Sequence, residues 1–406
     1  MIRVIVDSQS NRLFRGVPQE QAYDQRGGLC EVGEGDVVVT TNPFDPDYLQ
    51  YWKETLGFDL PHLMVAGPFD PHCTLSELIL LKHGLQNELR RMLGGEVARL
   101  EFFCIEESER KLATTLDIRP YCNFEIAIKL SRKPAFKRLF NEVGIPTPRW
   151  VSCAGQEGLL TKGKAFSEAQ GVCLLKTEDG TGGFTCGGMF LIKSPSELYE
   201  LARRNGDLGR EVIVEELVTG VQTVSAHWEI SDDKTLKPIG VFDQQGEYAY
   251  SGVSWPSSAP APVVERILAD ITHKLGPWLI KKGAVGFFCA DIVIDKEGRH
   301  WWVDFNPRKG AILYVYNMIR RLSTRHFGGT TCRFFHEHFR LPEGGDQSFA
   351  AIRDRLSNLL LPDERFVVIT NPGLIAFGYA DVTGVSLHSL KEAKLAFDCA
   401  KKNLLH

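Results

Sequence analysis

The sequence lacks the signals that identify several common protein classes. No pair of its ten cysteines has CxxC spacing, which argues against a zinc site or a disulfide framework and for reduced core cysteines. No apolar run approaches the roughly 20 residues of a membrane span, and residues 1–7 predict a short strand, not a signal peptide. A net charge of −4 without a block of like charge predicts no nucleic-acid partner. We therefore expect a cytoplasmic globular protein without a membrane partner.

Two nucleotide-binding motifs are also missing. No GxGxxG follows the first expected strand and no GKS or GKT occurs, so neither a dinucleotide site nor a P-loop is supported. Strands and helices nevertheless alternate up to about residue 119, which predicts a mainly parallel sheet with helices on its faces. The expected strands are Arg3–Asp7, Asp36–Thr41, His62–Ala66 and Leu100–Ile105, and the expected helices are Pro46–Leu56, Leu75–Leu93 and Glu107–Leu116. The turn at residues 41–46 follows a strand end, where open sheets tend to bind ligands.

Residues 285–310 carry the most informative pattern of the chain. Two apolar runs around a short glycine-containing turn predict a β-hairpin, with Asp291 in its first strand and Asp304 near the end of its second. Period-2 geometry puts Asn306 on the face of Asp304, and antiparallel pairing can bring Asp291 beside them. Two carboxylates and an amide oxygen suit Mg²⁺, for which Mn²⁺ can substitute, and Arg308 adds a nearby positive charge. The alternative is a pair of strand-end acids in solvent.

Two lysines lie beside features that suit phosphate groups. Lys133 begins a helix expected over Ser131–Gly144 and capped by Ser131, where the helix dipole disfavours a cation unless an anion is near. Lys176 ends an apolar strand that runs into the loop TEDGTGGFTCGG. Backbone N–H groups in such a loop can face phosphate oxygens, and the glycines concerned include Gly180, Gly182 and Gly183. A solvated lysine and a plain flexible hairpin remain alternatives.

The next segments offer contacts for the rest of a nucleotide and for a substrate. An adenine needs backbone hydrogen bonds and an apolar sandwich, and a ribose needs a polar side chain. The strand end at Glu215, Glu216 and Leu217, followed by Gln222, offers these groups. The proline-rich loop at residues 250–262 contains Ser254 and Trp255 and can cover a substrate, although a rigid surface connection is the alternative that sequence alone favours.

The order of these elements resembles the ATP-grasp superfamily. The resemblance covers residues 121–316 and rests mainly on the box DFNPR with its upstream Asp291, supported by GIPTP and the two lysines. It implies an ATP-grasp domain at residues 121–335, built from two α+β subdomains that clamp ATP. A Rossmann-like pre-ATP-grasp domain is expected at residues 1–120, and a C-terminal segment with a small α/β unit at residues 336–406. That unit is expected to contain strands at 366–369 and 374–379 and a helix at 389–402.

The resemblance also implies roles for individual residues. Lys133 and Lys176 would contact the phosphates and the glycine loop would close over them. Residues 215–217 would bind adenine, and Gln222 falls where many relatives have a ribose-binding glutamate. Asp291, Asp304 and Asn306 match magnesium ligands, and Arg308 would steady the transferred phosphate. Two departures are present: Asp304 replaces the more usual glutamate, and Cys289 stands where several amide-forming relatives have an arginine.

The expected reaction follows from these roles. A carboxylate attacks the γ-phosphate of ATP, and an amine then displaces phosphate from the acyl phosphate, which yields an amide, ADP and phosphate. The N-terminal α/β domain, the loop GVSWPSSAP and the C-terminal unit resemble peptide ligases of natural-product biosynthesis of the pheganomycin type, so amino acids or peptides are the expected substrates. The alternatives are transfer to a carrier-protein thiol and a nucleotide-binding scaffold without activity. A homodimer is the default expectation, and His336 and His338, whose spacing fits no zinc pattern, are expected at the surface.

Overall fold

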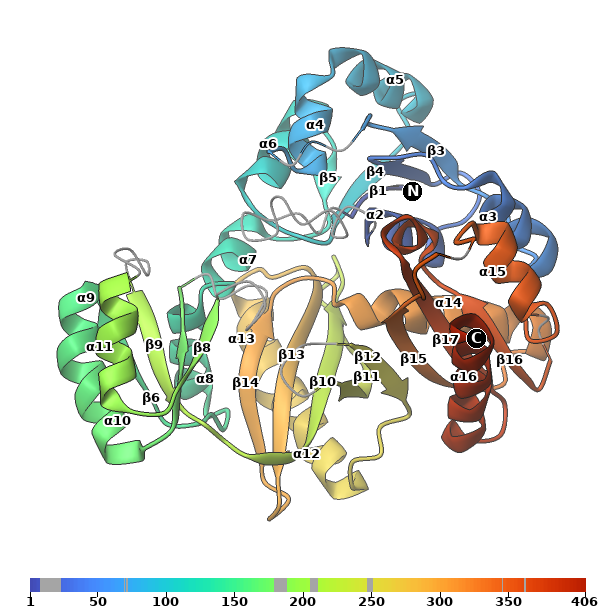
Figure 1. The fold of residues 1–406 in the computed structure, drawn as a ribbon. Coiled ribbons are helices and arrows are strands. Elements are labelled where there is room, and N and C mark those ends of the chain that lie inside the picture. The colour runs from blue at the N-terminus through green and yellow to red at the C-terminus, as the bar shows by residue number, and fades with distance from the viewer. Residues whose placement is uncertain are drawn as a thin grey trace. The chain divides into compact units, whose positions relative to one another are not determined.

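The computed structural model describes residues 1–7, 23–68, 70, 72–178, 188–204, 211–246, 251–344, 346–360 and 363–406. The chain divides into two compact units (Figure 1). Unit 1 contains residues 1–122, 251–257 and 308–406, and unit 2 contains residues 123–250 and 258–307. The boundary expected at residue 120 lies close to that at residue 122, whereas residues 308–335, expected in the ATP-grasp domain, pack within unit 1. None of the described helices is long and apolar enough to cross a membrane.

The first half of unit 1 is a parallel sheet of order β3-β2-β1-β4-β5, as the alternation predicts. Its strands are β1 (Ile2–Val6), β2 (Val37–Thr40), β3 (His62–Val65), β4 (Ala98–Phe102) and β5 (Arg119–Pro120). Its helices are α2 (Tyr23–Cys30), α3 (Pro46–Gln50), the π-helix η1 (Tyr51–Thr55), α4 (Leu75–Leu81), α5 (His83–Leu93) and α6 (Glu107–Leu116). Val4, Ile5 and Val6 of β1 and all of β2 are buried, as expected of a parallel sheet that helices cover.

The second half of unit 1 is antiparallel. Strands β12 (Gly252–Trp255), β15 (Arg333–Arg340), β17 (Tyr379–Ser386) and β16 (Arg365–Ile369) pair in this order. The other elements are α14 (Ala311–Phe327), α15 (Phe349–Leu356), the 3₁₀ helix η4 (Pro372–Phe377) and α16 (Leu390–Leu405). Phe397 of α16 packs against Phe335 and Phe339 of β15, which anchors the C-terminal helix on the sheet.

Two expectations for this region are wrong. The strand expected at residues 374–379 is the 3₁₀ helix η4, because Asn371 caps it through the Gly373 N–H and Pro372 fits its first turn. His336 is fully buried, not at the surface, because β15 carries it into the sheet opposite Thr383 of β17. There its Nδ1 lies 2.9 Å from Thr383 Oγ1 and 3.4 Å from Asp381 Oδ1.

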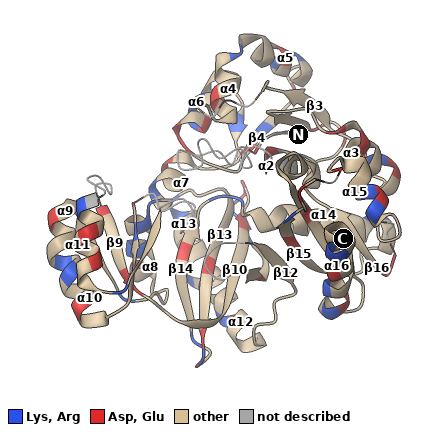
Figure 2. Ribbon diagram, in the orientation of Figure 1, with Lys and Arg blue, Asp and Glu red and all other residues tan. Residues whose placement is uncertain are grey.

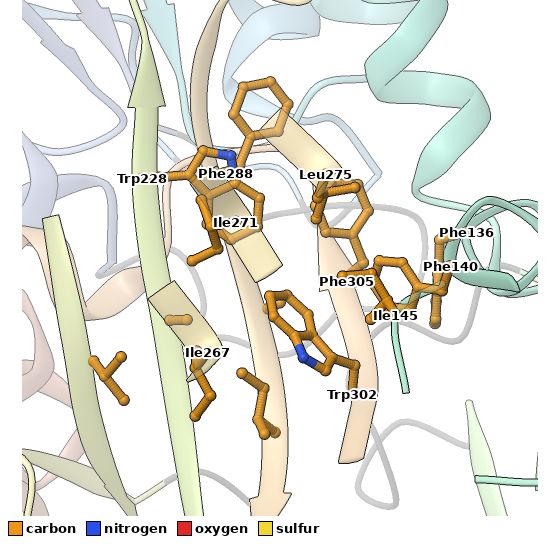
Figure 3. Close-up of a cluster of buried hydrophobic side chains, with 14 of the residues drawn as sticks. Phe136, Phe140, Ile145, Trp228, Ile267, Ile271, Leu275, Phe288, Trp302 and Phe305 are labelled. Atoms are coloured by element: carbon orange, nitrogen blue, oxygen red, sulfur yellow. The ribbon is translucent and has the colours of Figure 1, made fainter. Parts of the chain in front are cut away.

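Unit 2 contains two subdomains, each with its own core. The first has strands β14 (His300–Asn306), β13 (Gly286–Asp295), β10 (Gly220–Ile230) and β11 (Leu236–Gln245) in this antiparallel order. Its helices are α7 (Phe124–Leu130), α8 (Lys133–Val143), α12 (Ala261–Asp270), η3 (Ile271–Leu275) and α13 (Gly276–Lys281). Figure 3 shows that Phe136 and Phe140 of α8 lie beside Trp302 and Phe305 of β14 in the core between helix and sheet.

The second subdomain of unit 2 is smaller. Its sheet has the order β6-β9-β7-β8, with β6 (Trp150–Ala154), β9 (Glu211–Glu216), β7 (Cys173–Lys176) and β8 (Met189–Ile192). Its helices are α9 (Gly155–Gly158), η2 (Leu159–Gly163), α10 (Lys164–Gln170) and α11 (Pro195–Arg204). Gly144 ends α8 in a left-handed conformation as expected, but Ser131 does not cap the helix, because its hydroxyl donates to Ile128 O at the end of α7.

Candidate nucleotide and metal site

The hairpin β13–β14 brings the expected metal ligands together. Asp291 lies directly opposite Asp304, and Cys289 lies opposite Asn306. Directly paired residues of an antiparallel sheet share a face, so both carboxylates and the Asn306 amide lie on one face, while Phe305 between them enters the core on the other. The register thus gathers two carboxylates and an amide within one short stretch of sheet.

The two carboxylates differ in their surroundings. Asp304 forms an ion pair with Lys133 and accepts the N–H of Phe305 at 2.8 Å. Burial would raise the pKa of Asp304, but the charges of Lys133 and Lys176 outweigh it and hold the pKa below the usual value. Burial and the charge of Asp304 raise the pKa of Asp291, although Gln244 donates to it at 2.7 Å. A cation between the carboxylates would relieve this repulsion.

These groups fit a magnesium ion. Within the described part of the chain no group of three His, Cys, Asp or Glu side chains could hold a metal, so the set comprises two carboxylates and one amide. Mg²⁺ is usually held by one or two carboxylates and completes its shell with water and substrate phosphates. Asp291, Asp304 and Asn306 would therefore hold the ion and leave positions for phosphate oxygens. Figure 2 shows acidic residues on β13 and β14 and basic residues on α8.

Lys176 belongs to a buried charge cluster that sequence reasoning did not find. Glu215 is fully buried and contacts Lys176 Nζ at 2.6 Å through Oε1, while its Oε2 forms an ion pair with Lys137. Lys176 also donates to Val303 O at 2.8 Å, and Lys137 is itself fully buried. Burial lowers the pKa of Lys137 to about 8, with Glu215 opposing the shift. Lys137 lies four residues after Lys133 on α8, a spacing that could have suggested it.

This cluster changes the expected role of the side chains at the end of β9, residues 215–217, which were expected to bind adenine. The side chain of Glu215 serves as the counter-ion of two lysines, and Glu216 pairs with Arg149 at 2.9 Å. The backbone of Glu215 and Glu216 is already paired with β6 and β7, and the Glu216 N–H donates to Arg149 O at 2.8 Å, so a backbone contact to an adenine would come from Leu217, directly after the end of β9. The pKa of Glu215 is held below its usual value because Lys137 and Lys176 outweigh the effect of burial.

Hydrogen bonds hold the Gln222 side chain between Asp243 of β11 and Ser258 of the proline-rich loop. Its amide donates to Asp243 Oδ1 at 2.7 Å and to Ser258 Oγ at 3.0 Å. Asp243 Oδ2 accepts from the N–H of Ser258 at 2.8 Å and from its hydroxyl. Sequence reasoning did not place Ser225 and His227 near the site. Both lie on β10 with Gln222, and Ser225 Oγ is 3.0 Å from His227 Nε2. Ser225 faces Asp291 across the β10–β13 pairing.

The remaining residues predicted for the site either belong to unit 1 or fall among residues that the structure does not describe. Gly180, Gly182 and Gly183 fall within residues that the structure does not describe. Arg308 lies in unit 1, where its guanidinium carbon is 4.4 Å from the centre of the Phe103 ring and its Nη1 donates to Lys309 O. Ser254 is buried on β12, and Trp255 packs against Tyr316 and Phe334.

Comparisons with known proteins support the architecture. Residues 28–118 match the family model described as the Pre ATP-grasp domain. No curated protein matches the chain in sequence. N5-carboxyaminoimidazole ribonucleotide synthetase from Thermus thermophilus is similar in structure, with 14% identity, a TM-score of 0.62, and coverage of 100% of this chain and 99% of that chain.

Two further solved structures span nearly the whole chain. N5-carboxyaminoimidazole synthetase from Staphylococcus aureus, complexed with ADP, has 11% identity and a TM-score of 0.57, with coverage of 98% of this chain and 96% of that one. Carboxyaminoimidazole ribonucleotide synthase from Aspergillus clavatus, complexed with ATP, has 9% identity and a TM-score of 0.56, with 98% of each chain covered. The expected fold class is thereby confirmed: the chain has the ATP-grasp fold, with a pre-ATP-grasp domain in its N-terminal part.

Proposed function

We propose that the protein is an ATP-dependent ligase that joins a carboxylate to an amine through an acyl phosphate and releases ADP and phosphate. The observation that carries this proposal is the pairing of Asp291 with Asp304 beside Lys133, with Lys176 acting on the same carboxylate. The fold, which it shares with synthetases solved with ADP and ATP, agrees with this function. The substrates proposed are amino acids or peptides, as in ligases of the pheganomycin type.

The side chains of the site suit this chemistry. Mg²⁺, when bound, would neutralise charge on the phosphate oxygens. Lys133 and Lys176 would meet the same oxygens as ammonium groups, and each is already oriented by a carboxylate, Asp304 or Glu215. Fixed positive charge at the site of phosphoryl transfer stabilises the transition state because it needs no reorganisation during the reaction. Arg308 is proposed to add to this charge when the substrate is bound.

The proposal is tested by mass spectrometry of the protein with ATP, Mg²⁺ and a pool of amino acids and short peptides, with ADP, AMP and phosphate quantified together. New amide masses with ADP would support the ligase and identify its substrates. Bicarbonate belongs in the pool, because the similar structures are named for a product with a carboxyl group on nitrogen. Hydroxylamine trapping reports the acyl phosphate for amine and thiol acceptors alike. Formation of AMP and pyrophosphate would overturn the mechanism.

Replacing Lys176 with Met is expected to weaken ADP binding by about 10- to 100-fold, since a buried charged contact to phosphate is worth roughly 1.5–3 kcal/mol. The fold should survive, because Glu215 keeps Lys137 as its partner. Calorimetric titration with ADP and Mg²⁺ measures the change. Lys164→Met on α10 is the control, because that lysine is exposed and its ion pair with Glu168 spans 3.8 Å. Unchanged affinity in Lys176→Met would remove this lysine from the phosphate site.

Replacing Trp255 with Ala is expected to weaken binding of the carboxylate substrate by about tenfold, on the assumption that its exposed part contacts that substrate. ATP affinity should change little. Trp255→Phe retains the aromatic contacts with Tyr316 and Phe334 and serves as the control. Steady-state kinetics with each substrate varied in turn separates the two effects. An equal loss of affinity for both substrates, together with a lower melting temperature, would show that Trp255 acts only in packing.

A further inference from the structure

Strand β10 carries two buried polar side chains on the sheet face that also holds Asp291. Val224, Ala226 and Trp228 of this strand enter the core of unit 2. The alternate residues Ser225 and His227 therefore lie on the opposite face, with exposed fractions of only 2% and 1%. A buried polar side chain lowers stability unless it is hydrogen-bonded, so the role of these two residues lies in their partners.

Ser225 is the partner of the carboxylate. It lies directly opposite Asp291 across the β10–β13 pairing, and Asp291 in turn lies opposite Asp304. The Ser225 hydroxyl donates to Asp291, and this hydrogen bond opposes the rise in the pKa of Asp291 that burial and the charge of Asp304 cause. Gln244 of β11 donates to Asp291 Oδ1 at 2.7 Å. Two neutral donors thus fix the carboxylate and leave its negative charge uncompensated by them.

His227 is in turn the partner of Ser225. Its Nε2 lies 3.0 Å from Ser225 Oγ, which is a hydrogen-bonding distance. A hydroxyl has a single proton, and Ala290 O, another acceptor near it, is 3.4 Å away. When Ser225 gives its proton to Asp291, its oxygen accepts, so His227 Nε2 is the donor. The ring of His227 packs edge-on against Phe242 with ring centres 5.3 Å apart, which limits its rotation.

We infer that Ser225 and His227 are positioning residues, joined in a hydrogen-bonded chain that orients Asp291 toward a bound divalent cation. Carboxylates that bind metals are themselves usually hydrogen-bonded, because these bonds fix the direction of the ligand oxygen. Asp291 needs such fixing, since the like charge of Asp304 on the same face repels it. The inference rests on the proposed function, because it places the metal of that reaction between Asp291 and Asp304.

The test measures the affinity of the full-length protein for Mn²⁺ in the presence of ADP, from the electron paramagnetic resonance signal of free Mn²⁺. Ser225→Ala removes the hydroxyl and is expected to weaken Mn²⁺ binding by about 10- to 100-fold. His227→Leu keeps an apolar contact with Phe242 and should weaken Mn²⁺ binding by about tenfold. Affinity for ADP without a divalent cation, measured by calorimetry, should stay unchanged, because the chain acts on the metal ligand.

Two further variants separate positioning from a general loss of structure. His227→Gln places an amide N–H where Nε2 lies and should restore most of the affinity for Mn²⁺. In the Ser225→Ala background, His227→Leu should have almost no further effect, because His227 acts through the Ser225 hydroxyl. Ser196→Ala and His273→Leu are matched controls at exposed positions of unit 2, and both should bind Mn²⁺ like the wild type.

Three results would overturn the chain. They are unchanged Mn²⁺ affinity in Ser225→Ala, a full additional loss in the double variant, and a fall in metal-free ADP affinity equal to the fall in Mn²⁺ affinity. Each of them leaves the proposed ligase intact when the wild type forms ADP and an amide. Variants that lose Mn²⁺ affinity as expected, in a protein that makes no ADP, would refute the ligase alone. Absence of Mn²⁺ binding by the wild type would overturn both.

Discussion

Replacing Asp304 with Asn is expected to lower ligase turnover by about a thousandfold or more, which corresponds to the loss of several kcal/mol of charge stabilisation. The substitution keeps the shape of the side chain and an oxygen that can accept the Phe305 N–H. It removes the negative charge that pairs with Lys133 and that would hold the metal opposite Asp291. The variant loses the charge that would hold the metal and also the group that orients Lys133.

The control for this experiment is Asp304→Glu, which keeps the charge and restores the residue more usual in ATP-grasp enzymes. It should retain substantial activity, with a change in metal dependence. Turnover is measured as ADP release and as hydroxamate formed with hydroxylamine, and metal binding is followed with Mn²⁺ by electron paramagnetic resonance. Wild-type turnover in Asp304→Asn would exclude Asp304 from the reaction. Loss of turnover with unchanged Mn²⁺ binding would assign Asp304 to orienting Lys133 alone.

The sequence predicts much of this site because its main determinants are local. Alternating apolar residues and a single turn predict the hairpin, whereas a register shift between Asp291 and Ile292, which the pattern does not reveal, places Asp291 opposite Asp304 instead of Val303. The parallel sheet of unit 1 follows from the same kind of pattern, since buried strands read as short apolar runs between helices.

The features that sequence reasoning missed depend on pairing between distant segments. Glu215 was expected to contact adenine, yet its side chain is buried between Lys137 from α8 and Lys176 from β7. His336 is buried because its partners Asp381 and Thr383 come from a strand more than 40 residues further along the chain. A polar residue can be buried when its partner is present, and sequence spacing does not reveal that partner.

The pair of adjacent acids at the end of β9 gives a second prediction of large effect. Glu215→Gln is expected to lower the free energy of unfolding by about 3–5 kcal/mol at neutral pH, because it leaves Lys137 and Lys176 buried without their carboxylate. Glu216→Gln is the matched control and should cost less than about 1 kcal/mol, because the pair of Glu216 with Arg149 is exposed to solvent. Urea unfolding of both variants measures the difference.

The pH dependence of the Glu215→Gln variant separates charge from packing. The pKa of Lys137 is already lowered to about 8 by burial, and loss of Glu215 lowers it further. A lysine of the unfolded chain has a pKa near 10.4, so the unfolded chain binds more protons than the folded chain at every pH between the two pKa values. Stability therefore rises with pH over this interval, and loss of Glu215 widens the interval. Part of the lost stability should therefore return between about pH 7 and pH 9.5. A deficit that stays constant over this range would mean that Glu215 stabilises the subdomains through packing and hydrogen bonds, and that its charge is not what keeps Lys176 in place.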